Sequence, residues 1–261
     1  MIYKCDESKR EDVLNFLYQD PSVNLFAIGD IETYGVEHFD VDVWAYVNNK
    51  DDIIGVLVRY KENLMPIHGK DFEGFDTFLP LIQSLSPMYI SGSEEVIAQY
   101  EEEFIDYEKE ENCLAECKEL EMESPLLQQV VPLDKEDIQS YIDSLKETGM
   151  KHEQTIEEIA NDLDLNTSGI QVIKDENGKI ISSGRIAIET KLSGMILAVG
   201  TIESYRKQGY ATAIVSALVN YCNMKDKTAC LFYSDPDVGR LYQHLGFKDT
   251  QKWIMLKNKE D

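Results

Sequence analysis

Apolar and polar residues alternate in a regular way along the second half of the chain. Helical spacing of apolar residues alternates there with short runs of consecutive apolar residues, which are typical of buried strands. An Asn-Gly turn at 177–178 separates two such runs and predicts a β-hairpin. The predicted elements are a strand at 130–133, helices at 138–145 and 155–163, strands at 169–174, 180–188 and 195–199, a helix from Tyr210, a strand at 231–234, a helix ending at Leu245 and a strand at 253–256.

The first half of the chain repeats this order of predicted elements. Its elements are a helix at 10–18, strands at 41–47, 53–60 and 64–67, a helix from Phe75, a strand at 88–90, a helix at 94–104 and a strand at 113–122. Ser124-Pro125 interrupts regular structure between the halves, because the residue before a proline avoids helical conformation. We therefore expect two domains of similar α/β (α+β) architecture, at residues 1–123 and 124–261.

The segment Val199 to Val215 predicts a strand, a basic glycine turn and an apolar helix. Gly209 permits a backbone conformation or a close approach that a side chain would block. The first N–H groups of the helix have no partner within the helix, and they lie beside Arg206 and Lys207. Free amides, the positive end of a helix dipole and two cations together predict a phosphate-binding site.

Two sequence patterns about thirty residues apart resemble the signatures of one family. Arg206-Lys-Gln-Gly-Tyr-Ala211 resembles the R/Q-x-x-G-x-G/A signature of the GNAT superfamily of acyl-CoA-dependent N-acyltransferases. The segment from Asp235 to Phe247 resembles the same family's N-x-x-A-x-x-L-Y-x-x-x-G-F ending, with Leu241, Tyr242 and Gly246 in register. The resemblance implies two GNAT-like domains, each with a mixed, mostly antiparallel central sheet flanked by helices.

The resemblance also implies the roles of individual residues. Tyr242 matches the family's general acid, which supplies a proton to the departing thiolate of coenzyme A. Asp235 occupies the position of a cofactor-contacting asparagine, although a carboxylate cannot donate an amide N–H. No metal is implied. The expected acetyl-CoA-binding residues are Val199, Gly200, Thr201, Arg206, Lys207, Gln208, Gly209, Tyr210, Ala211, Thr212 and Asp235.

The general base is less clear from the sequence. The strand at 195–199 contains no carboxylate, so the nearest candidates are Glu189 before it and Glu203 after it. The sequence favours a solvated carboxylate over a base for each of them, because a base needs a specific pocket and a raised pKa. A chain of water molecules can also remove the proton from the amine.

The matching loop in the first half lacks the family signature. His68-Gly69-Lys70 is followed there by Asp71 and Glu73, whose carboxylates would repel a pyrophosphate. We expect this degenerate half not to bind coenzyme A. Structural support, formation of a homodimer and shaping of the acceptor pocket are the roles left open to it.

The charge of the chain limits the kinds of binding partner that we expect. The chain carries a formal net charge of −24, which argues against nucleic acid as a target. Residues 201–261 carry nine Lys or Arg and seven Asp or Glu, so the acidity lies elsewhere. This acidic surface would attract a cationic amine acceptor, but the simpler explanation, which we favour, is that it keeps the protein soluble. Five irregularly spaced cysteines, no apolar run of membrane-spanning length and no N-terminal signal pattern predict a cytoplasmic protein without membrane contact.

Two functions follow from the resemblance. The first is an N-acyltransferase, most simply an acetyltransferase, in which an amine attacks the thioester of acetyl-CoA directly. The second is a non-catalytic acyl-CoA-binding sensor or interaction protein. Retention of Tyr242 favours the enzyme, whereas Asp235 and the missing base keep the second function open.

Overall fold

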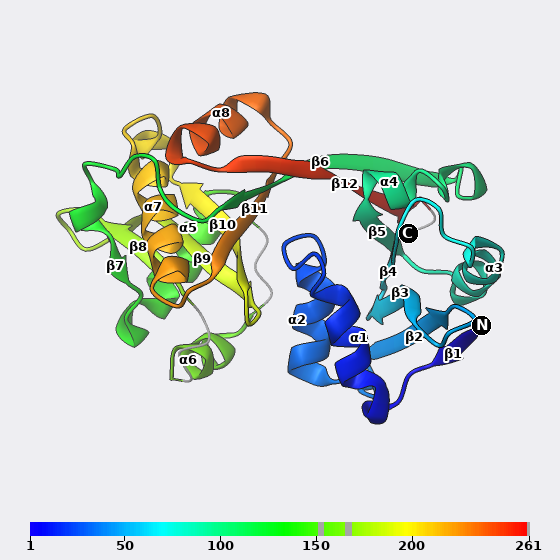
Figure 1. Ribbon diagram of the computed structural model, residues 1–261. Helices are drawn as coiled ribbons and strands as arrows, with labels where there is room; N and C mark the ends of the chain where they lie inside the picture. The colour runs from blue at the N-terminus through cyan, green and yellow to red at the C-terminus, as the bar shows by residue number, and fades with distance from the viewer. Residues whose placement is uncertain (151–153, 165–168, 260–261) are drawn as a thin grey trace. The chain divides into compact units, whose positions relative to one another are not determined.

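The computed structural model describes residues 1–150, 154–164 and 169–259 (Figure 1). The chain passes twice through the same order of elements, as the sequence predicts. The first series is β1 (Ile2–Lys4), α1 (Arg10–Leu17), α2 (Leu25–Tyr34), β2 (Val41–Val47), β3 (Ile53–Tyr60), β4 (Asn63–His68), α3 (Phe75–Leu85), β5 (Tyr89–Ser93), α4 (Glu94–Ile97) and β6 (Tyr107–Cys117). The second is β7 (Val131–Pro132), α5 (Ile138–Glu147), α6 (Ile156–Asp164), β8 (Gln171–Lys174), β9 (Ile180–Glu189), β10 (Ser193–Thr201), α7 (Tyr210–Asn223), β11 (Thr228–Tyr233), α8 (Pro236–Leu245) and β12 (Lys248–Asn258).

The chain packs into two compact units. The first unit contains residues 1–114 together with residues 250–261, and the second contains residues 115–249. These units differ from the predicted division at residues 123 and 124, because the C-terminal strand packs with the first half of the chain. Residues 253–257 of β12 pair antiparallel with β5. Ile254 and Leu256 are buried in the same cluster as Ile90 of β5.

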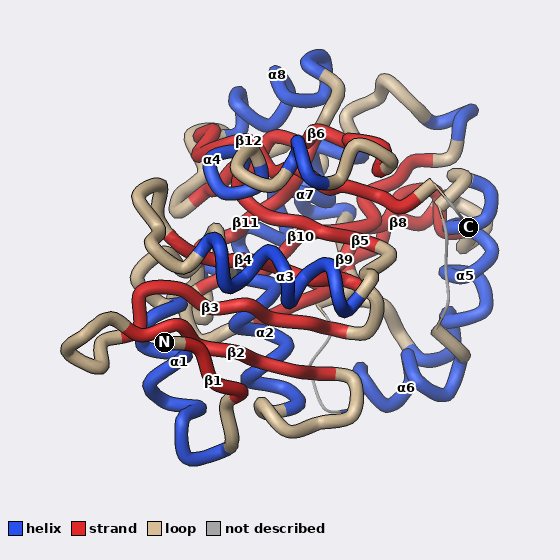
Figure 2. The backbone as a smooth tube through the Cα atoms, turned by 90° about the vertical axis from the view of Figure 1, so that its right-hand side faces the viewer, coloured by secondary structure: helices blue, strands red, loops and turns tan. Residues whose placement is uncertain are grey.

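The sheet of the first unit has the strand order β1-β2-β3-β4-β5-β12 and helices on both faces. Alternate residues of each strand face opposite sides of the sheet. Val56 and Val58 of β3 therefore pack with α1 and α2, while Leu57 between them packs with Phe78 of α3. Figure 2 shows α3 in front of β3 and β4, with α1 and α2 behind the sheet.

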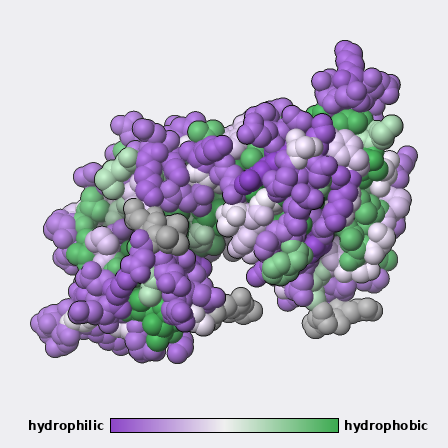
Figure 3. All heavy atoms as spheres, turned by 90° about the horizontal axis from the view of Figure 1, so that it is seen from below, coloured by the Kyte–Doolittle hydropathy of each residue, from purple (hydrophilic) through white to green (hydrophobic). Residues whose placement is uncertain are grey.

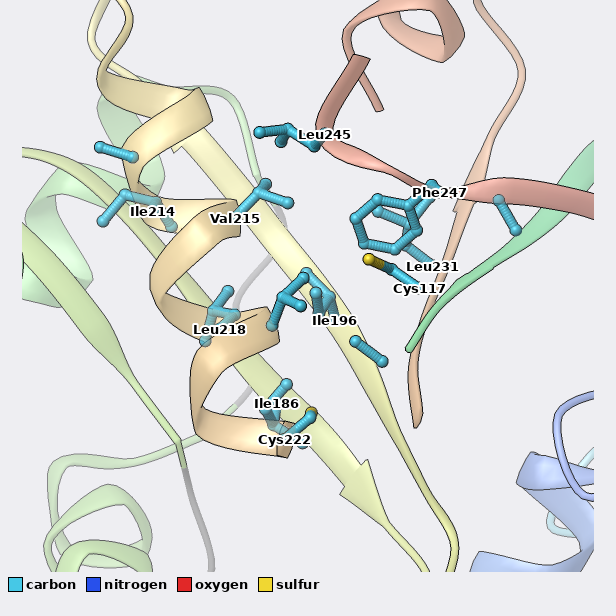
Figure 4. Packing of buried hydrophobic residues seen from close by; sticks show 14 of the residues in the cluster. Cys117, Ile186, Ile196, Ile214, Val215, Leu218, Cys222, Leu231, Leu245 and Phe247 are labelled. Atoms are coloured by element: carbon cyan, nitrogen blue, oxygen red, sulfur yellow. The ribbon is translucent and has the colours of Figure 1, made fainter. Parts of the chain in front are cut away.

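The second unit has the strand order β11-β10-β9-β8-β7, and helices again cover both faces. On one face, α7 buries an apolar stripe that includes Val215 and Leu218 against Ile196 of β10 (Figure 4). On the other face, Tyr141 of α5 and Ile159 of α6 pack with residues of β8 and β9. The mixed α/β fold class predicted from the sequence is confirmed.

Polar side chains cover most of the molecular face shown in Figure 3, in keeping with the strongly acidic composition. Within the three described stretches of the chain, no helix is long and apolar enough to cross a membrane.

Local differences from the predicted elements are few. The structure adds α2 and the short strand β1, which the sequence pattern did not predict. The predicted helix at 94–104 ends at Ile97, and a separate short 3-10 helix follows at Glu101–Glu103. Three consecutive glutamates form that second piece.

Candidate functional site

The site begins where two parallel strands separate. β10 and β11 pair over three residues only, ending at Met195 and Cys230. Beyond this point β10 bulges against β9, and its register shifts between Leu197 and Gly200. Ala198 within the bulge has a positive φ of 54°, an uncommon conformation for a residue with a side chain. The bulge and the divergence leave backbone groups of β10 directed away from a regular ladder, so a ligand can reach them.

The loop after β10 forms a pocket with the start of α7. Its volume is about 240 Å³, and residues from β10, the loop, α7 and α8 surround it. The lining residues are Thr201, Tyr205, Arg206, Lys207, Gly209, Tyr210, Ala211, Thr212 and Leu241. The two basic side chains are exposed, and the Nε of Arg206 donates a hydrogen bond to the carbonyl oxygen of Thr201 at 3.1 Å.

Gly209 sets the direction in which α7 starts. It is the N-cap residue and has a left-handed conformation, with φ of 89°. Lys207 also has a positive φ, of 62°, so the loop turns tightly just before the helix. No side chain caps α7, and its first N–H groups have no partner within the helix. This uncapped end and the adjacent cations suit a phosphate group.

Tyr242 lies on α8, one residue after Leu241 of the pocket wall. Its ring packs near Tyr233 and Phe247, at 6.0 and 5.7 Å between ring centroids. Burial raises its pKa above the ordinary value, so the hydroxyl stays protonated at neutral pH. A protonated phenol of this kind can donate a hydrogen bond or a proton to an anion that forms beside it.

Asp235 has a structural task in α8. It is the N-cap of this helix, and its side chain accepts a hydrogen bond from the backbone N–H of Asp237 at 2.8 Å. An N-cap aspartate satisfies one of the free amides of the first turn. The expected contact between Asp235 and a cofactor would therefore compete with this cap.

Glu189 is held by cations. One carboxylate oxygen lies 2.6 Å from the Nζ of Lys227 and 3.0 Å from the Nζ of Lys225, and Tyr221 donates a further hydrogen bond. Burial alone would raise its pKa, but the hydrogen bonds from both lysines lower the pKa below the ordinary value. A general base needs the opposite shift. The second candidate, Glu203, is exposed at the start of a short 3-10 helix.

The structure thus brings together much of the predicted cofactor set. Thr201 and six residues of the loop and first helical turn share one pocket, whereas Val199, Gly200, Gln208 and Asp235 lie outside its lining. The pocket adds Tyr205 and Leu241, which the sequence did not single out as cofactor contacts. Leu241 stands beside Tyr242 in the second motif, so its position in that motif was an available signal. Tyr205 could have been suspected from its place directly before the basic turn.

The corresponding loop of the first unit is filled by an aromatic side chain. β4 and β5 also pair in parallel over two residues only and then diverge. The ring of Phe72 stacks on His68 at 4.1 Å and packs on Phe78 at 4.9 Å. A Cβ on Gly74, the N-cap of α3, would lie 2.3 Å from this ring. The partly buried ring and the exposed carboxylates of Asp71 and Glu73 make this loop unsuitable for a pyrophosphate.

Solved structures with the same fold include several acetyltransferases. A GCN5-related N-acetyltransferase from Sphaerobacter thermophilus has a TM-score of 0.68 and 14% identity, covering 98% of this chain and 94% of its own. An acetyltransferase of the GNAT family from Colwellia psychrerythraea has a TM-score of 0.60 and 14% identity, covering 99% and 100%. A tandem GNAT protein from the clavulanic acid biosynthesis pathway has a TM-score of 0.60 and 9% identity, covering 98% of each chain. At these identities the likeness concerns the fold.

Comparison at the level of sequence gives the family. No curated protein matches the chain. The sequence profile of the GNAT acetyltransferase family matches residues 92–256, which is well over half of the chain, and this stretch includes the whole pocket of the second unit. The repeated order of elements, the diverging parallel strands and the uncapped helix after the basic loop agree with this match. The chain therefore belongs to the GNAT acetyltransferase family.

Proposed function

We propose that the protein is an N-acetyltransferase that transfers the acetyl group of acetyl-CoA to an amine. The observation on which this rests is the pocket at the start of α7, where Gly209, Arg206 and Lys207 surround an uncapped helix end. Each of these features favours a phosphate group, and coenzyme A presents a pyrophosphate. Backbone groups of Val199 to Thr201, at the bulged end of β10, are suited to the pantetheine arm beyond it.

The reaction forms a bond between the amine nitrogen and the acetyl carbon and breaks the bond between that carbon and sulfur. The amine attacks as the neutral form, and the proton that it loses passes to water. Tyr242 is the proposed general acid, and it transfers its proton to the leaving thiolate. Its raised pKa means that the hydroxyl is protonated in the resting site, and the phenolate left by the transfer regains a proton from water.

The proposal includes no carboxylate base. Glu189 is neutralised by two lysines, and its pKa is lowered. Glu203 is exposed and does not line the pocket. Removal of the amine proton through water fits the structure better than either residue. We further propose that the first unit has a supporting role and does not bind acetyl-CoA, because Phe72 fills the loop that would hold it.

A second candidate function is a sensor that binds acyl-CoA without turnover. The use of Asp235 as a helix cap favours it, since this leaves one expected cofactor contact unmade. The two functions make different demands on Tyr242, because binding alone does not require an acid close to the sulfur.

The experiment compares wild type with Tyr242→Phe, with Tyr233→Phe as the matched control. Tyr233 lies next to Tyr242, but its hydroxyl donates a hydrogen bond to Asp249 at 2.7 Å. Calorimetry with acetyl-CoA measures binding, and release of free thiol with a panel of amines measures turnover. Loss of a general acid lowers kcat by about 10²- to 10⁴-fold. We expect this loss for Tyr242→Phe with unchanged acetyl-CoA affinity, and near-wild-type turnover for Tyr233→Phe.

Each other outcome has a definite meaning. Unchanged turnover in Tyr242→Phe removes this tyrosine from the mechanism. Tight binding of acetyl-CoA by wild type without turnover of any amine favours the sensor. Failure of wild type to bind acetyl-CoA contradicts both functions.

A further inference from the structure

Three buried polar atoms in the second unit have no hydrogen-bond partner among the described residues: the Oγ of Ser193 on β10, the hydroxyl oxygen of Tyr141 on α5 and the Nε of Arg185 on β9. The last two lie on elements that pack against each other. Tyr141 is 1% exposed. A buried donor without a partner costs about 1–3 kcal/mol, and more when the group is charged. Two such donors on elements that pack together indicate a place where a ligand completes the hydrogen bonding.

Both residues lie on the side of the sheet where α5 and α6 pack. Ile186, the neighbour of Arg185 on β9, belongs to the core under α7, so Arg185 faces the other side. Tyr141 belongs to the core on that side, against which Ala198 of β10 also packs. The charge of Arg185 acts on the hydroxyl of Tyr141, opposing the rise in its pKa that burial causes. Tyr141 and Arg185 therefore lie on the same side of the sheet, on elements that pack against each other.

Their position relates them to the proposed reaction. Arg185 pairs in register with Leu197 of β10, immediately before the bulge that contains Ala198. Neighbouring strands in a sheet are about 4.8 Å apart. The backbone of Arg185 therefore lies one strand away from the part of β10 that is proposed to contact the pantetheine arm. Gln154, two residues before α6, lies over the same side, since the Nη1 of Arg185 donates a hydrogen bond to its side-chain oxygen. One edge of the guanidinium is thus fixed by protein, while Nε remains available.

The chemistry of the two groups limits what they can bind. An arginine Nε–H can only donate a hydrogen bond, and a protonated tyrosine hydroxyl can donate one as well, so a ligand with acceptor atoms satisfies both groups. The positive charge of the Arg185 guanidinium favours an anionic ligand. Arginine binds carboxylates with good geometry, and charge-assisted hydrogen bonds of this kind are about twice as strong as neutral ones.

We propose that Arg185 and Tyr141 bind a carboxylate on the acceptor, so that the substrate is an amine that also carries a carboxylate, such as an amino acid. This inference rests on the proposed N-acetyltransferase function. It also refines the expectation of a cationic acceptor, because such a substrate is a zwitterion. Its ammonium group meets the acidic surface on approach, and its carboxylate binds inside.

The test compares common amino acids with their carboxamides as acceptors of acetyl from acetyl-CoA. The variants are Arg185→Gln and Tyr141→Phe, with Lys146→Gln as a control that removes an exposed charge from the same helix as Tyr141. A fourth variant, Gln154→Ala, breaks the contact between Arg185 and the α5–α6 loop but leaves Nε in place. Calorimetry with N-acetylated amino acids and with their amides gives a readout that does not depend on turnover.

We expect wild type to prefer the acid over the amide by at least about 10-fold in kcat/KM, since a charge-assisted hydrogen bond is lost with the amide. Arg185→Gln should remove this preference mainly through KM, and Tyr141→Phe should reduce it. Lys146→Gln and Gln154→Ala should keep it. Acetyl-CoA affinity should stay unchanged in all four variants.

Three results would overturn the inference. One is that wild type uses or binds amides as well as acids, and another is that Arg185→Gln slows the reaction of both classes equally. If Gln154→Ala reproduces the effect of Arg185→Gln, then Arg185 only holds the loop. Failure of the proposed function is recognised separately, because wild type would then not bind acetyl-CoA or would not release thiol with any acceptor.

Discussion

Replacing Gly209 by aspartate should abolish most of the affinity for acetyl-CoA while leaving the protein folded. The site has room for the new side chain, because a Cβ at this position would meet only the Cδ1 of Leu126, at 3.5 Å. Because φ is 89° at this position, any residue with a side chain would have a strained backbone there. This strain is about 1–2 kcal/mol and applies with and without ligand, so it lowers the free energy of unfolding rather than the affinity.

The loss of affinity has two other causes. An aspartate at an N-cap accepts hydrogen bonds from the first amides of the helix, and these are the amides proposed for the pyrophosphate. The carboxylate also repels the phosphate charge. Two unit charges 4 Å apart interact by about 4 kcal/mol near a protein surface, and salt reduces this value. A net loss of about 2–3 kcal/mol corresponds to about 30- to 150-fold in Kd.

Two matched variants separate these contributions. Gly209→Ala introduces the strain without the charge or the cap, and it should bind acetyl-CoA within a few-fold of wild type. Gly178→Asp places an aspartate on another exposed glycine with φ of 83° and open space around it, outside the pocket lining. It should lose stability, as Gly209→Asp does, but keep its affinity.

The assay is calorimetric titration with acetyl-CoA at low and moderate salt, with thermal unfolding of each variant as the measure of stability. Wild-type affinity in Gly209→Asp would refute the assignment of the pyrophosphate to this loop. An equal loss in Gly209→Ala would show that backbone conformation, rather than charge and capping, governs binding.

Two further predictions concern stability. Glu189→Gln leaves Lys225 and Lys227 without their carboxylate and should lower the free energy of unfolding by about 1–3 kcal/mol in urea titrations, since these groups are only partly exposed. Turnover per folded molecule should not change, and a specific loss of turnover would restore Glu189 as a base. Burial raises the pKa of Asp30 to about 7, so between about pH 4 and pH 7 the folded state keeps a proton that the unfolded state releases. Stability should therefore fall as pH rises through this window, by at most about 1.4 kcal/mol per pH unit, and the fall should be absent in Asp30→Asn; equal pH dependence of the two proteins would contradict the burial argument.

Much of the second unit could be predicted from the sequence because the residues that specify each of its elements are close together in the chain. The basic glycine turn, the helix that follows and the motif from Asp235 to Phe247 each lie within about fifteen consecutive residues. Chain conformation within such a stretch follows from backbone sterics and helix periodicity. These same residues form most of the pocket found in the structure.

What could not be predicted depends on contacts between distant residues. Lys225 and Lys227, which neutralise Glu189, follow it by 36 and 38 residues. That the Tyr141 hydroxyl and the Arg185 Nε lack hydrogen-bond partners becomes apparent only when α5 packs on β9. The pairing of β12 with β5 joins residues about 160 positions apart, and an apolar strand pattern does not specify which sheet edge it joins.

That pairing has a consequence for how the protein is made. Residues 1–114 leave the ribosome first, yet the core of their unit lacks Ile254 and Leu256 until translation has passed through the whole second unit. The exposed edge of β5 must stay unpaired during that time, and an unpaired edge is a site of aggregation. Residues 115–249 form an uninterrupted stretch and can complete their contacts earlier. The half synthesised first is thus the half that finishes folding last.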